Sequence, residues 1–358
     1  MANALLGLCR PGFEPELAAE FTHHAAALGH YGHAVTERGT GVVRFVCDTA
    51  AALDAALGYD ELIFARQKLL AFGALQGIDP KDRISPLLAA LEAAREAHGD
   101  TLRFGDLLME HSDSDEGREL AGLARGFGNA LRPALRKPGW LTATDDPRRP
   151  RLHVLLSSGT QMALAMSRVG DSSPWPGGIP RLRQPPNAPS RSAAKLDEAL
   201  NTMLDERERA TLFAETANGV PRAADLGASP GGWTWVLLRA GMKVTAVDNG
   251  PLKSPVAEHP MVEHLRVDGF RWQPPRPLDW MVCDMVEQPR RVAERMAHWF
   301  REGWCRQAVF NLKLPMKKRW DETRLCLDLF REQAGYVSTL RAKQLYHDRE
   351  EITVFARR

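Results

Sequence analysis

Charged side chains follow several apolar segments in the second half of the chain, at positions where strands are predicted to end. They are Asp225, Asp248, Asp268, Asp284 and Lys313. The carboxyl ends of strands in an open parallel sheet meet at one edge, where ligands bind. Taken singly, Asp225 and Asp268 could cap turns and Lys313 could extend to solvent. A lysine beside an aspartate is unsuited to a core, so their shared position favours a site.

The turn after the first of these acids, DLGASPGGWT (225–234), indicates the class of ligand. An apolar run follows it, so the predicted order is strand, glycine-rich turn, helix, which directs an anionic group at a helix N-terminus. Asp248 stands where an acid binds the ribose of an adenosine. The GxGxxG spacing of dinucleotide sites is missing, which argues against a dehydrogenase. A smaller anion, such as an amino-acid carboxylate, suits this turn, and S-adenosylmethionine combines an amino acid with adenosine.

Five stretches, PSRSAAKLDEA, DLGASPGGWT, MVCDM, FNLKLP and REEITVFAR, resemble the FtsJ-type ribose 2′-O-methyltransferases over residues 188–358. The resemblance matches Lys195, Asp284, Lys313 and Glu351 to the Lys-Asp-Lys-Glu catalytic tetrad of that family. It also favours Ser192 as a cofactor contact, and we expect Trp233 to pack beside the cofactor. The predicted residues for S-adenosylmethionine are therefore Ser192, Ser229, Pro230, Gly231, Gly232, Trp233, Asp248, Asp268 and Asp284.

Three further strings, VDNGP, LYHDREE and NLKLPMKKR, together with the long N-terminal half, resemble the RlmM subfamily. That resemblance implies a cytidine of 23S ribosomal RNA as substrate, either naked or in an early precursor, and an N-terminal RNA-binding THUMP domain. Ser229 departs from the cysteine expected in some relatives, without consequence for the chemistry. A transfer RNA or a messenger cap are alternative substrates, which the tetrad alone does not separate. A catalytically silent RNA-binding scaffold is a further alternative, and the presence of all four tetrad residues argues against it.

The tetrad has a chemical rationale of its own. A ribose 2′-hydroxyl is a weak acid and needs a base within hydrogen-bond reach. A lysine serves only if its pKa falls from about 10.4, and burial with a second lysine would lower it. We therefore expect Lys313 to be the base, Lys195 to lower its pKa, and Asp284 and Glu351 to hold both lysines. No metal is expected, because the base removes the need and the five cysteines contain no CxxC pair.

The surrounding elements alternate between strands and helices after residue 190, which predicts a parallel sheet covered on both faces. The predicted fold is α/β: a Rossmann-like class I methyltransferase sheet at 191–358, mostly parallel with a C-terminal antiparallel hairpin. Small α+β units at 1–170 form the N-terminal RNA-binding region. A segment with six prolines, residues 171–190, is predicted to be a linker or a strap over a neighbouring domain.

Charge is unevenly spread over the 358 residues, whose net charge is +2. Residues 181–358 hold 29 basic and 23 acidic side chains, a net of +6, whereas residues 1–180 hold 18 and 22, a net of −4. Within the first part, residues 125–151 hold seven basic and two acidic side chains. This distribution favours a polyanionic partner. No apolar run is long enough for a membrane or a signal peptide, and five cysteines without a CxxC pair fit a reducing cytoplasm. We expect a cytoplasmic monomer that needs no protein partner, since nothing in the sequence suggests an obligate dimer.

Overall fold

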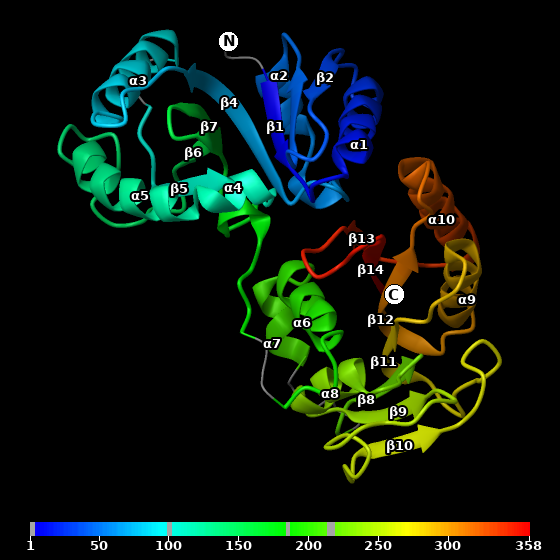
Figure 1. Cartoon of the computed structure of the whole chain (residues 1–358). Coiled ribbons are helices and arrows are strands. Elements are labelled where there is room, and N and C mark those ends of the chain that lie inside the picture. The colour runs from blue at the N-terminus through cyan, green and yellow to red at the C-terminus, as the bar shows by residue number, and fades with distance from the viewer. Residues whose placement is uncertain (1–3, 99–101, 184–186, 213–218) are drawn as a thin grey trace. The chain divides into compact units, whose positions relative to one another are not determined.

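The computed structural model describes residues 4–98, 102–183, 187–212 and 219–358. It contains two compact units, Met1–Pro180 and Arg181–Arg358 (Figure 1). Each unit is built on a seven-stranded sheet with helices packed against it. The predicted mixed α/β organisation is confirmed. None of the described helices is long and apolar enough to cross a bilayer.

The second unit alternates strands and helices along most of its length. Its helices are α6 (Ala193–Thr202), α7 (Glu206–Leu212), α8 (Gly232–Arg239), α9 (Pro289–Arg301) and α10 (Arg319–Gln333). Its strands are β8 (Arg222–Leu226), β9 (Lys243–Val247), β10 (Val262–Leu265), β11 (Leu278–Cys283), β12 (Cys305–Lys313), β13 (Thr339–Lys343) and β14 (Glu351–Arg357). The central strands are nearly continuous apolar runs, because both faces of the sheet are covered.

The strand order of this sheet is β10-β9-β8-β11-β12-β14-β13. Neighbouring strands are parallel from β10 through β9, β8 and β11 to β12. Strand β14 is antiparallel to both β12 and β13. The chain order reverses beside β8, which has β9 on one side and β11 on the other. Such a reversal is where open α/β sheets bind their ligands.

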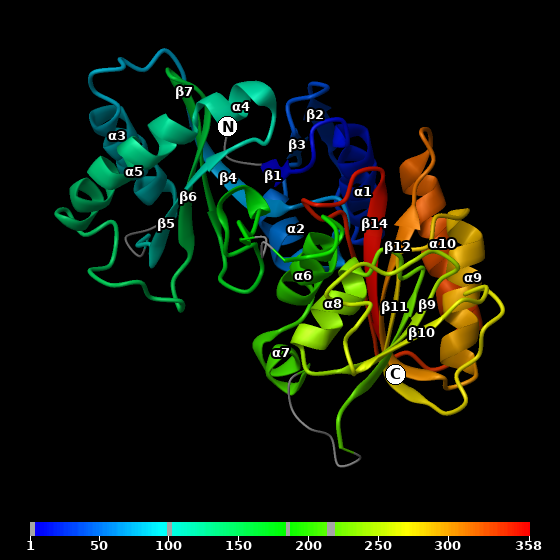
Figure 2. The same ribbon diagram turned by 60° about the horizontal axis from the view of Figure 1, so that its bottom comes forward.

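Helices cover both faces of the second sheet, with α6 and α8 on one side and α9 and α10 on the other (Figure 2). The core between the sheet and the first pair includes Leu196, Val236, Val282 and Phe355, all buried. Helix α6 therefore lies against the sheet, and its side chains can reach the ends of the strands.

The first unit consists of two α+β halves that share one long strand. Its helices are α1 (Glu14–Ala27), α2 (Ala50–Ala56), α3 (Ile84–His98), α4 (Asp115–Glu119) and α5 (Ala121–Arg136). Its strands are β1 (Ala4–Leu8), β2 (His33–Thr36), β3 (Val42–Val46), β4 (Gln67–Leu75), β5 (Asp106–His111), β6 (Arg151–Ser158) and β7 (Gln161–Ser167). The order is β2-β3-β1-β4-β7-β6-β5, and β4 pairs with β1 by its first part and with β7 by its second.

The first part of the proline-rich segment packs onto the first unit as a strap. Asp171 accepts hydrogen bonds from Lys68 Nζ at 2.8 Å and from the Tyr59 amide at 2.7 Å. The amide of Ser173 donates to Gln67 Oε1 at 2.9 Å. The buried Glu110 accepts from a backbone amide further along the strap. Hydrogen bonds with polar groups of the first unit thus anchor the strap.

Candidate active site

The structure brings Lys195, Asp284, Lys313 and Glu351 into one cluster. Lys313 Nζ contacts both Asp284 Oδ1 and Glu351 Oε2. Lys195 Nζ contacts Glu351 Oε1 and lies 3.5 Å from Asp284 Oδ2. Each ammonium therefore bridges the same two carboxylates. The lysine side chains are 17% and 24% exposed, so the cluster is partly buried but open to a substrate.

Four elements position this cluster. Asp284 follows the last residue of β11, and Lys313 is the last residue of the neighbouring parallel strand β12. Glu351 begins β14 and is the cross-strand partner of Lys313 in the antiparallel register. Lys195 reaches the same edge from the first turn of α6. The residues are distant in sequence, and sheet pairing alone places three of them side by side.

The electrostatics of Lys313 differ from the sequence-based expectation. Burial by itself lowers the pKa of this lysine, but the charges and hydrogen bonds of Asp284 and Glu351 outweigh it, so the pKa is raised above its usual range. The predicted lowering of the lysine pKa is therefore wrong for the protein without ligand. The physical reason is that the Lys313 ammonium contacts two carboxylates directly.

The glycine-rich turn lies between β8 and α8. Gly231 has φ of 110°, a conformation that favours glycine, and it precedes the first residue of α8. A Cβ on Gly232 would lie 2.5 Å from Ser192 Oγ and even closer to Ser190 Oγ. The turn thus has no room for a side chain at Gly232, and the positive φ disfavours one at Gly231. This close approach of backbone and hydroxyls fits a small anionic group at the start of α8.

Asp248 organises the loop that faces this turn. Its Oδ2 accepts from the Ser229 amide at 3.0 Å and its Oδ1 from the Gly250 amide at 2.7 Å. The Ser229 hydroxyl donates to the carbonyl of Pro251 at 2.9 Å. A carboxylate with one amide on each oxygen still has lone pairs for ribose hydroxyls. The position of Asp248 is therefore compatible with the predicted contact to the ribose of an adenosine.

Ser192 and Trp233 join the turn to α6. The indole Nε1 of Trp233 donates to the carbonyl of Ser192 at 3.0 Å, and the Trp233 ring is buried. Ser192 is the N-cap residue of α6 without a capping hydrogen bond, because its hydroxyl lies 2.6 Å from Ser190 Oγ instead. A cap role for the hydroxyl is thus excluded, and the residue lies beside Gly232, as a cofactor contact requires.

Asp225 and Asp268, the two remaining predicted acids, differ in how deeply they are buried. Asp225 is 1% exposed at the end of β8, and burial raises its pKa to about 7. Thr234 Oγ1 donates to its Oδ2 at 2.6 Å, while its Oδ1 has no hydrogen-bond partner within the described residues. Asp268 instead is half exposed and accepts from the Phe270 amide at 2.8 Å within its own loop. The geometry of Asp268 is that of a turn residue, and no tetrad residue contacts it in the described part of the chain.

Sequence reasoning missed several buried polar residues beneath the tetrad. Asn311 Nδ2 donates to Asp284 Oδ1 at 3.0 Å, and Thr353 and Asp348 continue the contact inward. Glu198 on α6 accepts from the Tyr346 and His347 amides at 2.7 and 2.9 Å. The available signal was a polar residue inside an apolar strand, as in VFNLKL and EITVFA.

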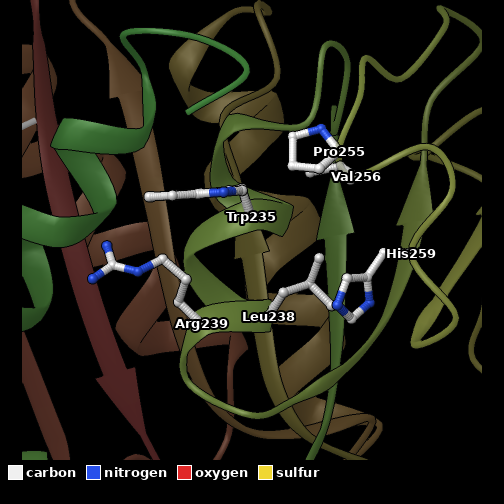
Figure 3. Close-up of a pocket in the computed structure, with 6 residues that line it drawn as sticks. All are labelled: Trp235, Leu238, Arg239, Pro255, Val256 and His259. Carbon is white, nitrogen blue, oxygen red and sulfur yellow. The ribbon is translucent and has the colours of Figure 1, made fainter. Parts of the chain in front are cut away.

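A separate hollow of about 140 Å³ lies on the outer face of α8 (Figure 3). Trp235, Leu238, Arg239 and Val256 are among its lining residues, and Arg239 stacks on Trp235 at 4.7 Å from the ring centroid. It contains no tetrad residue and no residue of the glycine-rich turn, so it is not the candidate site. Over the ranges that the structure describes, no group of three or more His, Cys, Asp or Glu side chains is arranged to hold a metal ion.

Comparison with known proteins finds relatives along the whole chain. Residues 188–334 match the family model of the FtsJ-like methyltransferase. Residues 1–69 match the RlmM ferredoxin-like domain, and residues 82–168 match the N-terminal model of ribosomal RNA large subunit methyltransferase M. These two N-terminal matches correspond to the two halves that meet at β4.

Curated relatives carry one common name. The chain is 64% identical over 356 residues to the ribosomal RNA large subunit methyltransferase M of Xanthomonas axonopodis pv. citri, with 99% of each chain covered. It is 63% identical over 356 residues to the protein of the same name from Xanthomonas oryzae pv. oryzae, again with 99% of each covered.

Proposed function

This chain belongs to the ribosomal RNA large subunit methyltransferase M family, and on that premise we propose that it methylates the ribose 2′-hydroxyl of a cytidine in 23S ribosomal RNA. The methyl donor is S-adenosylmethionine. The observation that supports a ribose hydroxyl as acceptor is the cluster of two lysines and two carboxylates at the carboxyl edge of the sheet. A base is what a hydroxyl acceptor needs.

The cofactor is held, in this proposal, by the turn after β8 and the loops after β9 and β10. The start of α8 at Gly231 and Gly232, with Ser192, Ser229, Pro230 and Trp233 around it, binds the amino-acid end, and Asp248 binds the ribose. Asp225 places a buried carboxyl beneath the turn, where a cationic amino group would favour its charged form. Asp268 and Asp284 line the same edge. When bound, S-adenosylmethionine supplies a methyl group on a cationic sulfur that leaves as a neutral thioether.

The residues of the tetrad have different roles in this proposal. Lys313 removes the proton of the 2′-hydroxyl, and Asp284 and Glu351 fix the direction of its Nζ by direct contact. Lys195 shares both carboxylates, so it keeps the four charges balanced and limits the rise of the Lys313 pKa. Orientation of the hydroxyl in line with the methyl group supplies much of the remaining rate.

The raised pKa of Lys313 has a consequence for this mechanism. Only the neutral amine can accept a proton, and the two carboxylates favour the ammonium. The fraction of enzyme that can act as base therefore rises with pH. Any further positive charge next to the cluster, including a sulfonium, favours the neutral amine.

We propose that the N-terminal region, residues 1–170, binds RNA and contains the THUMP domain, with residues 171–190 as linker and 191–358 as the methyltransferase domain. The basic segment 125–151 supports this role. Four of its seven basic residues pair with acids. Arg125, Arg136 and Lys137 are exposed, and none of them forms an ion pair with any residue that the structure describes. Arg125 and Arg136 are 11 positions apart on α5, which places them on one face.

The proposal is tested with labelled S-adenosylmethionine and unmodified 23S ribosomal RNA, with unmodified transfer RNA as the alternative acceptor. A ribose 2′-O-methyl group blocks alkaline cleavage of the adjacent linkage. We expect one protected linkage, after a cytidine of the 23S RNA, with the protein as a cytoplasmic monomer on naked or early precursor RNA. Label on a base, or faster transfer to transfer RNA, would contradict the proposal.

A further inference from the structure

A chain of three buried polar residues leads inward from the tetrad. Asn311 Nδ2 lies 3.0 Å from Asp284 Oδ1, and Asn311 Oδ1 lies 2.8 Å from the Thr353 hydroxyl. That hydroxyl lies 3.0 and 3.3 Å from the two carboxyl oxygens of Asp348. Asn311, Thr353 and Asp348 are all 0% exposed. Asn311 and Thr353 are cross-strand partners, two residues along from the pair formed by Lys313 and Glu351. The chain therefore lies on the same face of the sheet as the tetrad.

The direction of the hydrogen bonds follows from the acid at the tetrad end. The ionised Asp284 can only accept, so Asn311 must present its amide N–H to it. The carbonyl oxygen of Asn311 then faces Thr353 and must accept the single hydroxyl proton. Thr353 Oγ1 has no proton left for Asp348. The contact between the Thr353 hydroxyl and the Asp348 carboxyl is a hydrogen bond only if Asp348 donates.

The surroundings of Asp348 agree with a protonated acid. Burial, followed by the charge of Glu351, raises the pKa of Asp348 well above its usual value, and Glu198 acts in the same direction. The Leu345 amide and Lys195 oppose this shift. Asp348 Oδ2 accepts from the Leu345 amide at 3.0 Å, so we assign the proton toward Thr353 to Oδ1.

We propose that Asp348 functions as a neutral acid at the head of a one-way hydrogen-bond chain, Asp348 to Thr353 to Asn311 to Asp284, that orients the catalytic carboxylate. This inference rests on the proposed function of the tetrad. Asp348, Thr353 and Asn311 are positioning residues, since none of them contacts a reacting atom. Because Asp284 Oδ1 also contacts Lys313 Nζ, the chain fixes the direction of the base.

The test compares variants that keep each donor with variants that remove it. Asp348→Asn retains an N–H in place of the acid O–H, and Thr353→Ser retains the hydroxyl. Asp348→Ala and Thr353→Val break the chain without adding charge. We expect the two conservative variants to stay within about threefold of wild type in single-turnover rate, and the two disruptive ones to lose about 10- to 100-fold, as misplacement of a reacting group does. Cofactor affinity, by calorimetry, should change little in all four.

A second measurement does not depend on activity or on how well the alanine variant folds. In the protein labelled with ¹³C at the aspartate carboxyls, the Asp348 signal is assigned by its loss in Asp348→Asn. We expect it to have the shift of a protonated acid through about pH 7. An ionised Asp348 at that pH, or an Asp348→Asn variant as slow as Asp348→Ala, overturns the inference.

One control separates this inference from the proposed function. Lys313→Ala in the same assay should be inactive whatever the chain does. If Lys313→Ala stays active, the role of the tetrad is wrong. If Lys313→Ala is inactive while Thr353→Val transfers at the wild-type rate, only the hydrogen-bond chain is wrong.

Discussion

Replacement of Asp225 by asparagine tests whether the buried acid beneath the cofactor turn is kept at the expense of stability. Its pKa is raised from 3.8 to about 7, chiefly by burial. Below about pH 4 the acid is protonated in both the folded and the unfolded protein, so it has no effect on the free energy of unfolding. Between about pH 4 and pH 7 the unfolded chain ionises first, so stability falls as the pH rises. Above about pH 7 the full cost is present.

The magnitude follows from the size of this shift. Three pKa units at about 1.4 kcal/mol each correspond to about 4 kcal/mol, of which about 3 kcal/mol develops between about pH 5 and pH 8. An asparagine at this position cannot ionise, and its carbonyl can still accept from Thr234 Oγ1. Its amide N–H takes the place of an oxygen without a partner in the described residues, at a cost of about 1–3 kcal/mol that is independent of pH.

The assay is urea unfolding followed by tryptophan fluorescence. Seven of the nine tryptophans lie in residues 181–358, so the signal reports mainly on the unit that contains Asp225. The difference in free energy of unfolding, Asp225→Asn minus wild type, should increase by about 3 kcal/mol from about pH 5 to pH 8. We also expect the variant to bind the cofactor more weakly. Asp328→Asn, at an exposed position of α10, is the control. An effect of Asp225→Asn that is the same at both pH values would refute the reasoning.

Three further predictions concern the tetrad, the turn and the basic segment. Glu351→Gln removes one cause of the raised Lys313 pKa, so the rising limb of the rate against pH should move to lower pH while the maximal rate falls; a shift to higher pH contradicts this. Gly232→Ala places a Cβ against Ser190 and Ser192 and should weaken cofactor binding by about tenfold in calorimetry, whereas Gly122→Ala, with nothing within 4 Å of the new Cβ, should not. Arg136→Glu with Lys137→Glu should weaken RNA binding and reduce its salt dependence by about one unit of slope for each phosphate that is no longer neutralised. Arg38→Glu, exposed on the same unit, is the control, and equal effects of the two changes would contradict a specific role for α5.

Much of the candidate site could be predicted because its residues follow from strand order. Asp284 and Lys313 stand at the ends of apolar runs, and a parallel sheet brings such ends together. Glu351 and Lys195 do not stand out by themselves, since an exposed helix lysine and an edge-strand glutamate are common. Their places came from the resemblance to a family, and the structure brings Lys195 into contact with Glu351 and within 3.5 Å of Asp284.

The features of the site that could not be predicted depend on burial and on side-chain contacts, which the sequence alone does not show. The direction of the Lys313 pKa is set by two carboxylates in contact with it, and the sequence alone suggested the opposite direction. Asp348 belongs to a polar stretch that predicts a surface turn, and Thr353 belongs to a strand predicted near the edge of the sheet, yet both are 0% exposed. The division of the N-terminal region at β4 was also missed, because a strand that pairs with both halves is not interrupted at that point.

The central claim, that Lys313 is the base, is tested most directly by Lys313→Arg in single-turnover transfer to 23S RNA. Arginine keeps the positive charge and can pair with both carboxylates, but it does not lose its proton at any working pH. We expect a rate loss of about 10²- to 10⁴-fold at every pH, with cofactor affinity within a few-fold of wild type. A Lys313→Arg enzyme that transfers methyl groups at a rate near that of wild type would contradict the account.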